Sequence, residues 1–230
     1  MFTINELTEI GLWILYITPA ILFLYIAYLI LTKAFRYMGF NSFEAIIIVF
    51  VSFLFDFDII LIGVNISNIF LFSYGNWLVG INMGGAVIPI LLSIYLTIKK
   101  KLPIKKLFIG IIVVTIFAYF VTFPDPSKGI VAKLPIGLLP AFIASIISVA
   151  FLYKDFKKAA PFAYISGTLG VLIGADFLHI GELLNYQIDK PINAIIGGAN
   201  VFDMIYITGI VAVILDGIIL FKQRKSRAIN

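Results

Sequence analysis

The chain has 230 residues, of which 62% are hydrophobic and only 13% are charged, and its mean hydropathy is +1.10. Soluble domains are about 45–50% apolar, so this composition excludes an ordinary soluble protein and predicts a polytopic membrane protein. The absence of cysteine excludes a disulfide framework, a thiolate metal site and a cysteine nucleophile. The formal charge of +5 does not indicate nucleic-acid binding, because the lysines and arginines cluster at the ends of apolar runs.

Seven apolar runs are long enough to cross about 30 Å of hydrocarbon. In chain order they occupy about 10–32, 44–64, 78–98, 107–123, 134–153, 160–180 and 201–221. The first ten residues carry two glutamates and no lysine or arginine, so we expect a retained first helix rather than a secretory signal. The sequence therefore predicts an all-α membrane protein with about seven transmembrane helices, in which residues 1–230 form a single domain.

The basic residues test this count and orient it. Fourteen of the 17 lysines and arginines follow the first run, separate the third from the fourth and the fifth from the sixth, or follow the seventh. Seven crossings place all four of these segments on one side of the membrane, which the positive-inside rule identifies as cytoplasmic. We therefore expect a multipass protein of the cell membrane with its N-terminus outside and its C-terminus in the cytoplasm.

Five aspartates interrupt the apolar runs. An ionised carboxylate in hydrocarbon costs at least about 2.5–3.5 kcal/mol, so such residues point to a functional site. The expected orientation puts four of them in the outer half of the membrane and leaves the fifth about 20 Å deeper; they are Asp56, Asp58, Asp176, Asp203 and, deeper, Asp216. The first pair diverges by about 200° on a helix, so both can face one outward site only across a local break.

The sixth run combines a small-residue stripe with one of these acids. Ala163, Gly167, Gly170 and Gly174 recur on one helical face, which indicates close packing against another helix. Asp176 lies on the opposite face and is a candidate ligand for a cation or a proton. The alternative is an aspartate at the membrane surface that is solvated by lipid headgroups.

His179 and Glu182 follow Asp176 at steps of three residues, so they share its side of the helix if the helix continues. A histidine beside a carboxylate is typical of a proton relay. The simpler interpretation places both residues at the wet end of the helix. A metal site would need matching carboxylates on partner helices, so we expect no metal and no cofactor.

A short motif occurs twice, 113 residues apart. Asn82 precedes Gly84 and Gly85 at the start of the third run, and Gly197 and Gly198 precede the seventh. If the match is not a coincidence, it indicates a parallel repeat of three helices, a linking helix and three more. The glycines are expected to break the helices at membrane depth and to offer backbone groups to a ligand.

Asp203 follows the second glycine motif. We expect the hydroxyl of Tyr206, one turn further on, to hydrogen-bond to its carboxylate. The alternative is that Asp203 caps the seventh helix by accepting hydrogen bonds from its first amides. Capping would not exclude a functional role.

The chain resembles a family of prokaryotic multipass membrane proteins, domain of unknown function 1614. The resemblance covers most of residues 45–215 and depends on three motifs, which are Asn82-x-Gly84-Gly85-Ala86-x-Ile88-Pro89, Ser166-Gly167-Thr168-Leu169-Gly170…Gly174-Ala175-Asp176 and Gly197-Gly198-Ala199-x-x-Phe202-Asp203. It implies a membrane location and points to Asn82, Asp176 and Asp203. Asp56 and Asp58 depart from the family's small, Asn-containing second helix, and the family has no established activity.

Three functions remain open, and whether the protein is an enzyme stays open with them. The first is proton- or cation-coupled transport of a small solute by Asp176, Asp203, Asn82 and the glycine motifs. The second is an intramembrane aspartyl protease in which Asp176 and Asp203 share a proton and cleave a membrane-helix substrate. The third is a non-catalytic membrane subunit or assembly factor. The expected partners are the lipid bilayer, a small solute or cation or a helix substrate, and further copies of the chain, with no nucleic acid.

Overall fold

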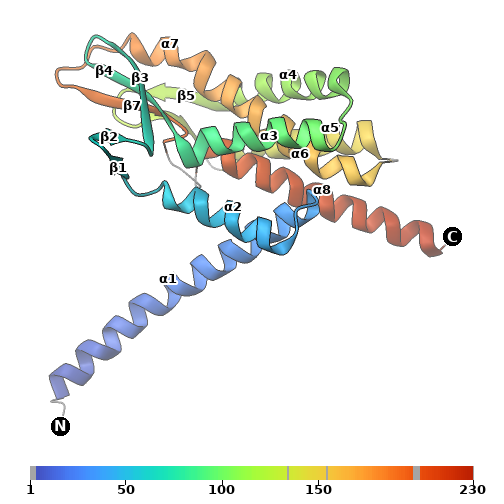
Figure 1. The fold of residues 1–230 in the computed structure, drawn as a ribbon, viewed down its shortest axis with the longest axis horizontal. Coiled ribbons are helices and arrows are strands. Elements are labelled where there is room, and N and C mark those ends of the chain that lie inside the picture. The colour runs from blue at the N-terminus through green and yellow to red at the C-terminus, as the bar shows by residue number, and fades with distance from the viewer. Residues whose placement is uncertain (1–3, 134, 154, 199–202, 230) are drawn as a thin grey trace.

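The computed structural model describes residues 4–133, 135–153, 155–198 and 203–229. It consists of seven helical segments and seven short strands (Figure 1). In chain order its elements are α1 (Ile4–Tyr37), α2 (Ser42–Leu54), β1 (Ile60–Leu61), β2 (Val64–Asn65), β3 (Asn68–Tyr74), β4 (Trp77–Asn82), η1 (Met83–Val87), α3 (Ile88–Lys99), α4 (Ile104–Val121), β5 (Thr122–Asp125), β6 (Gly129–Ala132), η2 (Ile136–Leu138), α5 (Leu139–Leu152), α6 (Phe156–Val171), η3 (Leu172–Phe177), α7 (Leu178–Leu184), β7 (Ile192–Ile196) and α8 (Met204–Ile229).

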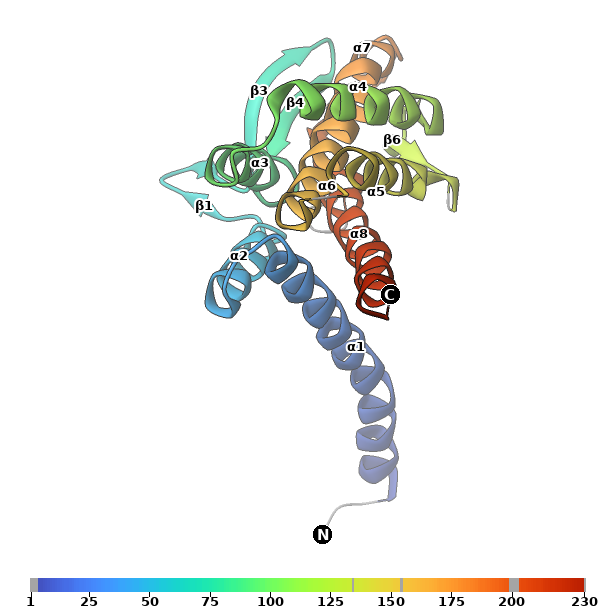
Figure 2. The ribbon, with the colours of Figure 1, turned by 90° about the vertical axis from the view of Figure 1, so that its right-hand side faces the viewer.

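The continuous helix α6–η3–α7 lies at the centre of the helical bundle. Helices α3, α4, α5 and α8 all pack against α6 (Figure 2). The small-residue stripe explains how they come so close: a Cβ atom on Gly170 would overlap Val114 of α4, and one on Gly167 would press on Thr208 of α8. The predicted packing role of these glycines is therefore confirmed, and the stripe serves two neighbouring helices.

Helix α1 projects away from this bundle and meets the rest of the molecule only near its C-terminal end (Figures 1 and 2). Its large apolar side chains are exposed along most of its length, including Trp13, Tyr16 and Phe23. The C-terminal turns differ, because Ala34 and Phe35 are fully buried in the main core. A helix of this composition is suited to contact with lipid.

The strands gather at one end of the molecule, which we call the β end (Figure 1). Strands β3, β4 and β7 form a sheet in that order, with β3 antiparallel and β7 parallel to β4. Strands β5 and β6 form a separate antiparallel hairpin, as do β1 and β2. The β end joins the segments between helices α2 and α3, α4 and α5, and α7 and α8.

These strands correct the expectation of an all-α protein. The second predicted helix, 44–64, ends at Leu54, and the third, 78–98, begins as strand β4 and becomes helical only at Met83. The helix stops because the next residues form local turns: the Ser67 hydroxyl donates to the carbonyl of Phe57 and accepts from the amide of Ile59. Apolar runs of this length do not by themselves distinguish buried strands from helices.

Within the described part of the chain, three helices are long and apolar enough to cross a membrane, which indicates a membrane protein; they are Leu15–Tyr37, Ile104–Val121 and Lys157–Leu184. Four further apolar helices have 10–17 residues, namely Ser42–Leu54, Met83–Lys99, Ile136–Leu152 and Met204–Ile219. A helix of 13 residues such as α2 is about 20 Å long, shorter than the hydrocarbon layer. The seven helical segments therefore do not all have the length that the sequence analysis predicted.

Candidate functional site

A cavity of about 340 Å³ lies under the β end. Four structural features form its wall: the tip of the β5–β6 hairpin, strand β7, the η3–α7 face of the central helix, and the start of α8. Asp176 and Asp203 both line it, although they lie on different helices and are 27 residues apart. The structure thus brings together the two carboxylates that the sequence analysis ranked first.

Asp176 sits on η3, a π-helical turn inside the central helix. Single π turns occur frequently at functional sites, since the extra residue widens the helix. The backbone amide of Gly197 donates a hydrogen bond to the Asp176 carboxyl group. The second oxygen, Oδ2, is buried and has no hydrogen-bond partner among the described residues. Asp176 as a whole is half-buried, so its carboxyl group is partly shielded from the surroundings of the helix.

Asp203 precedes the first turn of α8. Its Oδ1 atom accepts a hydrogen bond from the amide of Ile205 at 2.9 Å, and its carbonyl oxygen accepts one from the amide of Ile207. This geometry confirms the capping interpretation, because a capping carboxylate satisfies amides that the helix leaves unpaired. Asp203 nevertheless remains in the cavity wall, so the same residue caps the helix and adds a carboxyl group to the cavity.

The two glycine motifs lie side by side. Strands β4 and β7 pair in parallel with Ile81 opposite Ile196, so the motifs that follow them start at the same level. A Cβ atom on Gly197, which has a φ of +70°, would lie 2.8 Å from the Cβ of Ala86. The motif residues Ala199, Asn200 and Phe202 lie outside the described residues.

Among the described glycines of these motifs, Gly198 lines the cavity. Asn82 is buried and caps η1, where its Oδ1 accepts from the amide of Gly85 and its Nδ2 donates to Asn68. Gly84 allows η1 to approach α2, because a Cβ there would lie 2.6 Å from the carbonyl oxygen of Ser52. Asn82, Gly84 and Gly85 thus shape the β end without reaching the cavity.

Asp56 and Asp58 do not lie on a membrane helix, because α2 ends two residues before the first of them. Asp58 is exposed, and its carboxylate accepts hydrogen bonds from the side-chain amides of Asn65 and Asn68. It therefore holds the β1–β2 hairpin against β3 and does not line the cavity. Asp56 and Asp58 could face one cavity only across a break in the helix. The helix does end at Leu54, but the chain then forms the β1–β2 hairpin.

Tyr206 is fully buried, and its hydroxyl group makes no hydrogen bond to the Asp203 carboxylate. The expected hydrogen bond to Asp203 is therefore wrong. The hydroxyl lies near that of Ser52 on α2. The cap explains this outcome, since the Asp203 carboxylate turns toward the first amides of its own helix.

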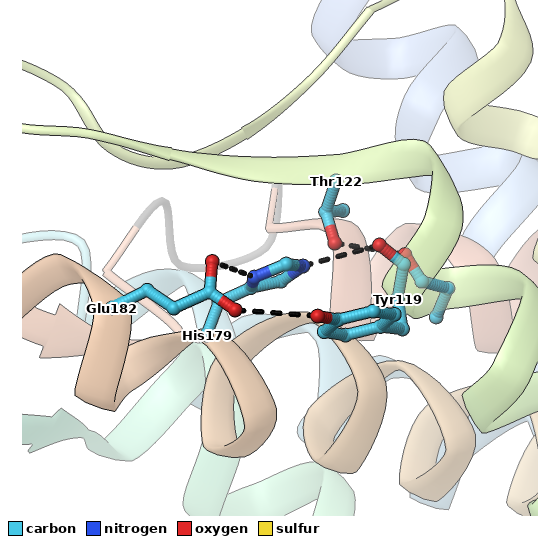
Figure 3. Close-up of polar contacts among 5 residues, drawn as sticks. Tyr119, Thr122, His179 and Glu182 are labelled. Carbon is cyan, nitrogen blue, oxygen red and sulfur yellow. Dashed lines mark hydrogen bonds and ion pairs between the residues drawn. The ribbon is translucent and has the colours of Figure 1, made fainter.

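His179 forms a separate polar cluster with Tyr119 and Glu182 (Figure 3). Its ring stacks on that of Tyr119 with centroids 4.4 Å apart, and its two nitrogens lie 3.2 Å from a Glu182 oxygen and 3.1 Å from the Tyr119 carbonyl oxygen. Both neighbours are acceptors, so the ring N–H of His179 has an acceptor in either tautomer. His179 is only 4% exposed, so the expectation that it lies at the solvated end of the helix is wrong. His179 does not line the cavity either.

Several residues that line the cavity on the side of the β5–β6 hairpin were not predicted from the sequence. The hairpin tip contributes Pro126, Ser127 and Lys128, and β4 contributes Trp77, whose indole N–H donates to the carbonyl of Tyr186. A signal for the hairpin is present in the sequence, because Pro-Asp-Pro-Ser-Lys-Gly at 124–129 is typical of a turn between two strands. The apolar run Ile192–Ile196 between Pro191 and the glycines is a comparable strand signal.

The hairpin tip is built around Asp125. Its Oδ1 accepts hydrogen bonds from the hydroxyl and the amide of Ser127, at 2.6 and 2.8 Å. The Ser127 hydroxyl is the main cause that holds the pKa of Asp125 below its usual value, and the two backbone amides and Lys128 contribute further. This turn positions Lys128, which lines the same cavity as the two carboxylates.

The cavity thus combines two acidic side chains, one lysine and the backbone of β7. Such a wall suits a small ligand that carries a positive charge or several hydrogen-bond donors. A family model described as "Protein of unknown function (DUF1614)" matches residues 55–215, which is more than half of the chain. No curated protein matches the chain. No solved structure matches it either.

Proposed function

The chain belongs to the DUF1614 family, and we propose that it is a multipass protein of the cell membrane that transports a small solute coupled to a proton or cation. The solute site is the cavity under the β end, with Asp176 and Asp203 as its acidic ligands. The cavity volume of about 340 Å³ falls in the range of about 300–1,000 Å³ that is usual for small-molecule sites.

One observation carries this proposal: Oδ2 of Asp176 is buried without a partner in the wall of a cavity. An unpaired buried carboxylate oxygen costs free energy, so a protein that keeps one has a use for it. A bound cation, a proton or a donor group of the solute would supply the missing partner. The parallel pairing of β4 and β7, each of which leads into a glycine motif, supports a parallel repeat around this site.

The transport proposal is tested in proteoliposomes on a solid-supported membrane. The probes are jumps in concentration of ammonium, sodium, polyamines and amino acids at fixed pH. We expect a transient current with one of these probes that falls at least tenfold in the Asp176→Asn, Asp203→Asn double variant. Asp155→Asn is the matched control, because Asp155 pairs with Lys158 on the surface of the first turn of α6. Equal currents in the wild type and the double variant would contradict the proposal.

We propose the orientation with the β end outside, since the lysine-rich links lie at the opposite ends of α3 and α4. The natural absence of cysteine allows a direct test. Ser73→Cys, on exposed β3, should react with a membrane-impermeant maleimide in intact cells, and Lys105→Cys should react only after the cells are opened. The reverse pattern would overturn the orientation.

A second candidate function is peptide hydrolysis, and the edge of β7 favours it. Strand β7 pairs with β4 on one side, and its residues line the cavity that holds the two aspartates. An extended peptide could therefore add to β7 and present a peptide bond beside Asp176 and Asp203. Two neighbouring carboxyl groups that share a proton could then activate a water molecule.

Hydrolysis and transport predict different products. A protease would release new peptide termini from a panel of membrane-helix peptides in proteoliposomes, detected by mass spectrometry, and Asp176→Asn would abolish them. A transporter would leave every peptide intact and give currents with small solutes. Absence of both cleavage and currents would favour the non-catalytic membrane subunit.

A further inference from the structure

A second cavity, of about 500 Å³, lies at the tip of the β end, and we call it the outer cavity. Two segments line it, namely the β3–β4 turn at residues 74–77 and the link between α7 and β7 at residues 184–189. Figures 1 and 2 show this turn and the end of α7 at the same edge of the molecule. The volume of the outer cavity falls within the range of about 300–1,000 Å³ that is usual for small-molecule sites.

Hydrogen bonds from the turn hold the two segments together. Nδ2 of Asn76 donates to the carbonyl of Ile188 at 2.8 Å, and the indole N–H of Trp77 donates to the carbonyl of Tyr186 at 3.0 Å. The carbonyl of Asn76 accepts from the amide of Ile192, also at 3.0 Å. The two side-chain bonds join positions 112 and 109 residues apart in the chain. The wall is therefore built by the fold itself, which lowers the cost of ordering it around a ligand.

Three aromatic residues belong to this wall. Tyr74 is 57% exposed and Tyr186 is 42% exposed, so a ligand can contact both of them. Trp77 is only 2% exposed, and it lines both the outer cavity and the cavity that holds the two aspartates. Aromatic rings give the outer cavity flat apolar surfaces on which another ring can stack.

The rest of the wall is polar and carries little charge. Three carboxamides line the outer cavity, from Asn76, Asn185 and Gln187, together with one carboxylate, from Asp189. Asn185, Gln187 and Asp189 are exposed, so their polar groups are open to a ligand. Among the described residues that line this cavity there is no lysine, arginine or histidine. Each carboxamide offers both an acceptor oxygen and a donor NH₂ group.

This combination of groups suits a neutral saccharide. A sugar ring has a face of C–H groups that packs on an aromatic ring, and its edge carries hydroxyl groups that each donate and accept hydrogen bonds. Carboxamides match such hydroxyl groups because they also donate and accept. The Asp189 carboxylate adds acceptors for further hydroxyl groups. An anion would meet no cationic side chain in the described wall, and a cation would leave the NH₂ donors of the wall unused.

We propose that the outer cavity binds a neutral saccharide. Its two exposed tyrosines stack on the sugar, and its exposed carboxamides and carboxylate bind the hydroxyl groups; these residues are Tyr74, Tyr186, Asn185, Gln187 and Asp189. The site is distinct from the cavity of Asp176 and Asp203, so the inference goes beyond the proposed transport and does not depend on it. In the proposed orientation the site faces the outside of the cell, where a free sugar or the end of a glycan can reach it.

Binding is tested by saturation-transfer difference NMR with the full chain in lipid nanodiscs. The neutral probes are glucose, galactose, N-acetylglucosamine, maltose and maltotetraose, and the charged probes are tetramethylammonium and glucose 6-phosphate. We expect a saturable signal from at least one neutral sugar. No saturable signal from any neutral sugar would overturn the proposal, and so would tighter binding of a charged probe than of every neutral one.

The length of the bound saccharide separates the two sources of the ligand. Affinity that rises from glucose through maltose to maltotetraose supports the proposal with a glycan as the ligand. Equal affinities for the three probes, or a signal from a monosaccharide alone, support it with a free sugar.

The place of binding is tested with exposed side chains, whose replacement leaves the fold intact. Tyr186→Ala keeps the backbone carbonyl that holds Trp77 and should weaken binding of the sugar at least tenfold. Tyr16→Ala is the matched control, because Tyr16 is an exposed tyrosine of α1 that does not line the outer cavity. Equal affinities of these two variants would overturn the assigned site.

A second pair of variants removes a charge and keeps the size of the side chain. Asp189→Asn should weaken binding at least threefold, whereas Asp155→Asn, on the surface of α6, should leave it unchanged. Binding that survives Tyr186→Ala and Asp189→Asn but is lost in the Asp176→Asn, Asp203→Asn double variant would place the sugar in the other cavity and overturn the inference. Saccharide binding without any solute current would leave the inference standing and count only against transport.

Discussion

Helix α1 and the central helix α6–η3–α7 are both long and apolar, yet their surroundings are opposite. The most apolar 18-residue window of Leu15–Tyr37 in α1 has a mean hydropathy of 2.0 and contains no buried residue, whereas the corresponding window of Lys157–Leu184 has a mean hydropathy of 1.4 and is 67% buried. The less hydrophobic helix is therefore the one inside the protein. In a membrane protein, hydrophobicity marks the surface that faces lipid, and small and polar residues mark the surface that faces other helices.

The largest effect is expected from enlarging a glycine of the central helix. In Gly174→Leu, the new Cβ atom would lie 2.8 Å from the Cβ of Ala118 and closer still to the Thr115 carbonyl oxygen. Overpacking of this kind costs about 1–3 kcal/mol or more, so Tm in detergent should fall by several degrees. Ala20→Leu on the exposed part of α1 should leave Tm unchanged. Equal changes in Tm for Gly174→Leu and Ala20→Leu would contradict the inferred difference in packing between the two helices.

A second prediction concerns His179, which is buried on the continuation of the central helix. His179→Phe keeps a flat ring against Tyr119 but leaves the Tyr119 carbonyl and Glu182 without this donor. Loss of a buried partner costs about 1–3 kcal/mol, which a Tm measurement detects. Tyr16→Phe, on the 70% exposed Tyr16 of α1, is the control and should change Tm little. A Tm for His179→Phe as high as the control's would show that the cluster does not contribute to stability.

The third prediction changes a spectroscopic signal and not the stability. The chain has two tryptophans, Trp13 on α1 with 66% exposure and Trp77 on β4 with 2%. In vesicles of brominated lipid, the Trp77→Phe variant, which retains Trp13, should lose most of its fluorescence. The Trp13→Phe variant, which retains Trp77, should lose little. Strong quenching of Trp77 instead would mean that the β end lies in lipid.

The smallest effect is expected at the exposed hairpin tip. Because the pKa of Asp125 is lowered in the folded protein, its contribution to stability is complete above the unfolded pKa of about 3.9 and disappears as the pH falls through the lower folded value. The protection factors of the Ser127 and Lys128 amides against hydrogen exchange, which correct for the intrinsic pH dependence of exchange, should therefore fall on acidification in the wild type. Asp125→Asn should show no such step. A step of equal size in the variant would assign it to another group.

The sequence predicted the helical core well, because its signals are local. Residues four positions apart, such as Gly170 and Gly174, lie on the same face of a helix. Their packing and the position of Asp176 on the opposite face could therefore be inferred. The neighbourhood of Asp176 and Asp203 in one cavity also followed from their shared depth in adjacent helices. The position of Asp58 in a hairpin could not be inferred, since an apolar run does not show where a helix ends and a strand begins.

The roles of polar residues were harder to predict for a related reason. Asn82 and Tyr206 were expected at the ligand site, but Asn82 caps η1 and Tyr206 faces Ser52. A polar side chain near a helix start can serve either the ligand or the unpaired amides of its own helix, and the choice depends on the tertiary structure. The covering hairpin and β7 were missed because short strands carry a weak local signal.

The pairing of β4 with β7 also constrains how the protein is made. Trp77 and Ile192 are opposite each other in the sheet and 115 residues apart in the chain. At about 5–20 residues per second, a ribosome needs roughly 6–23 seconds to synthesise the second strand after the first. A nascent chain that ends before Ile192 contains six of the seven helical segments and still lacks one wall of the cavity. The edge of β4 that faces β7 therefore has no β7 partner until Ile192–Ile196 has been made, and the cavity cannot be complete before that point.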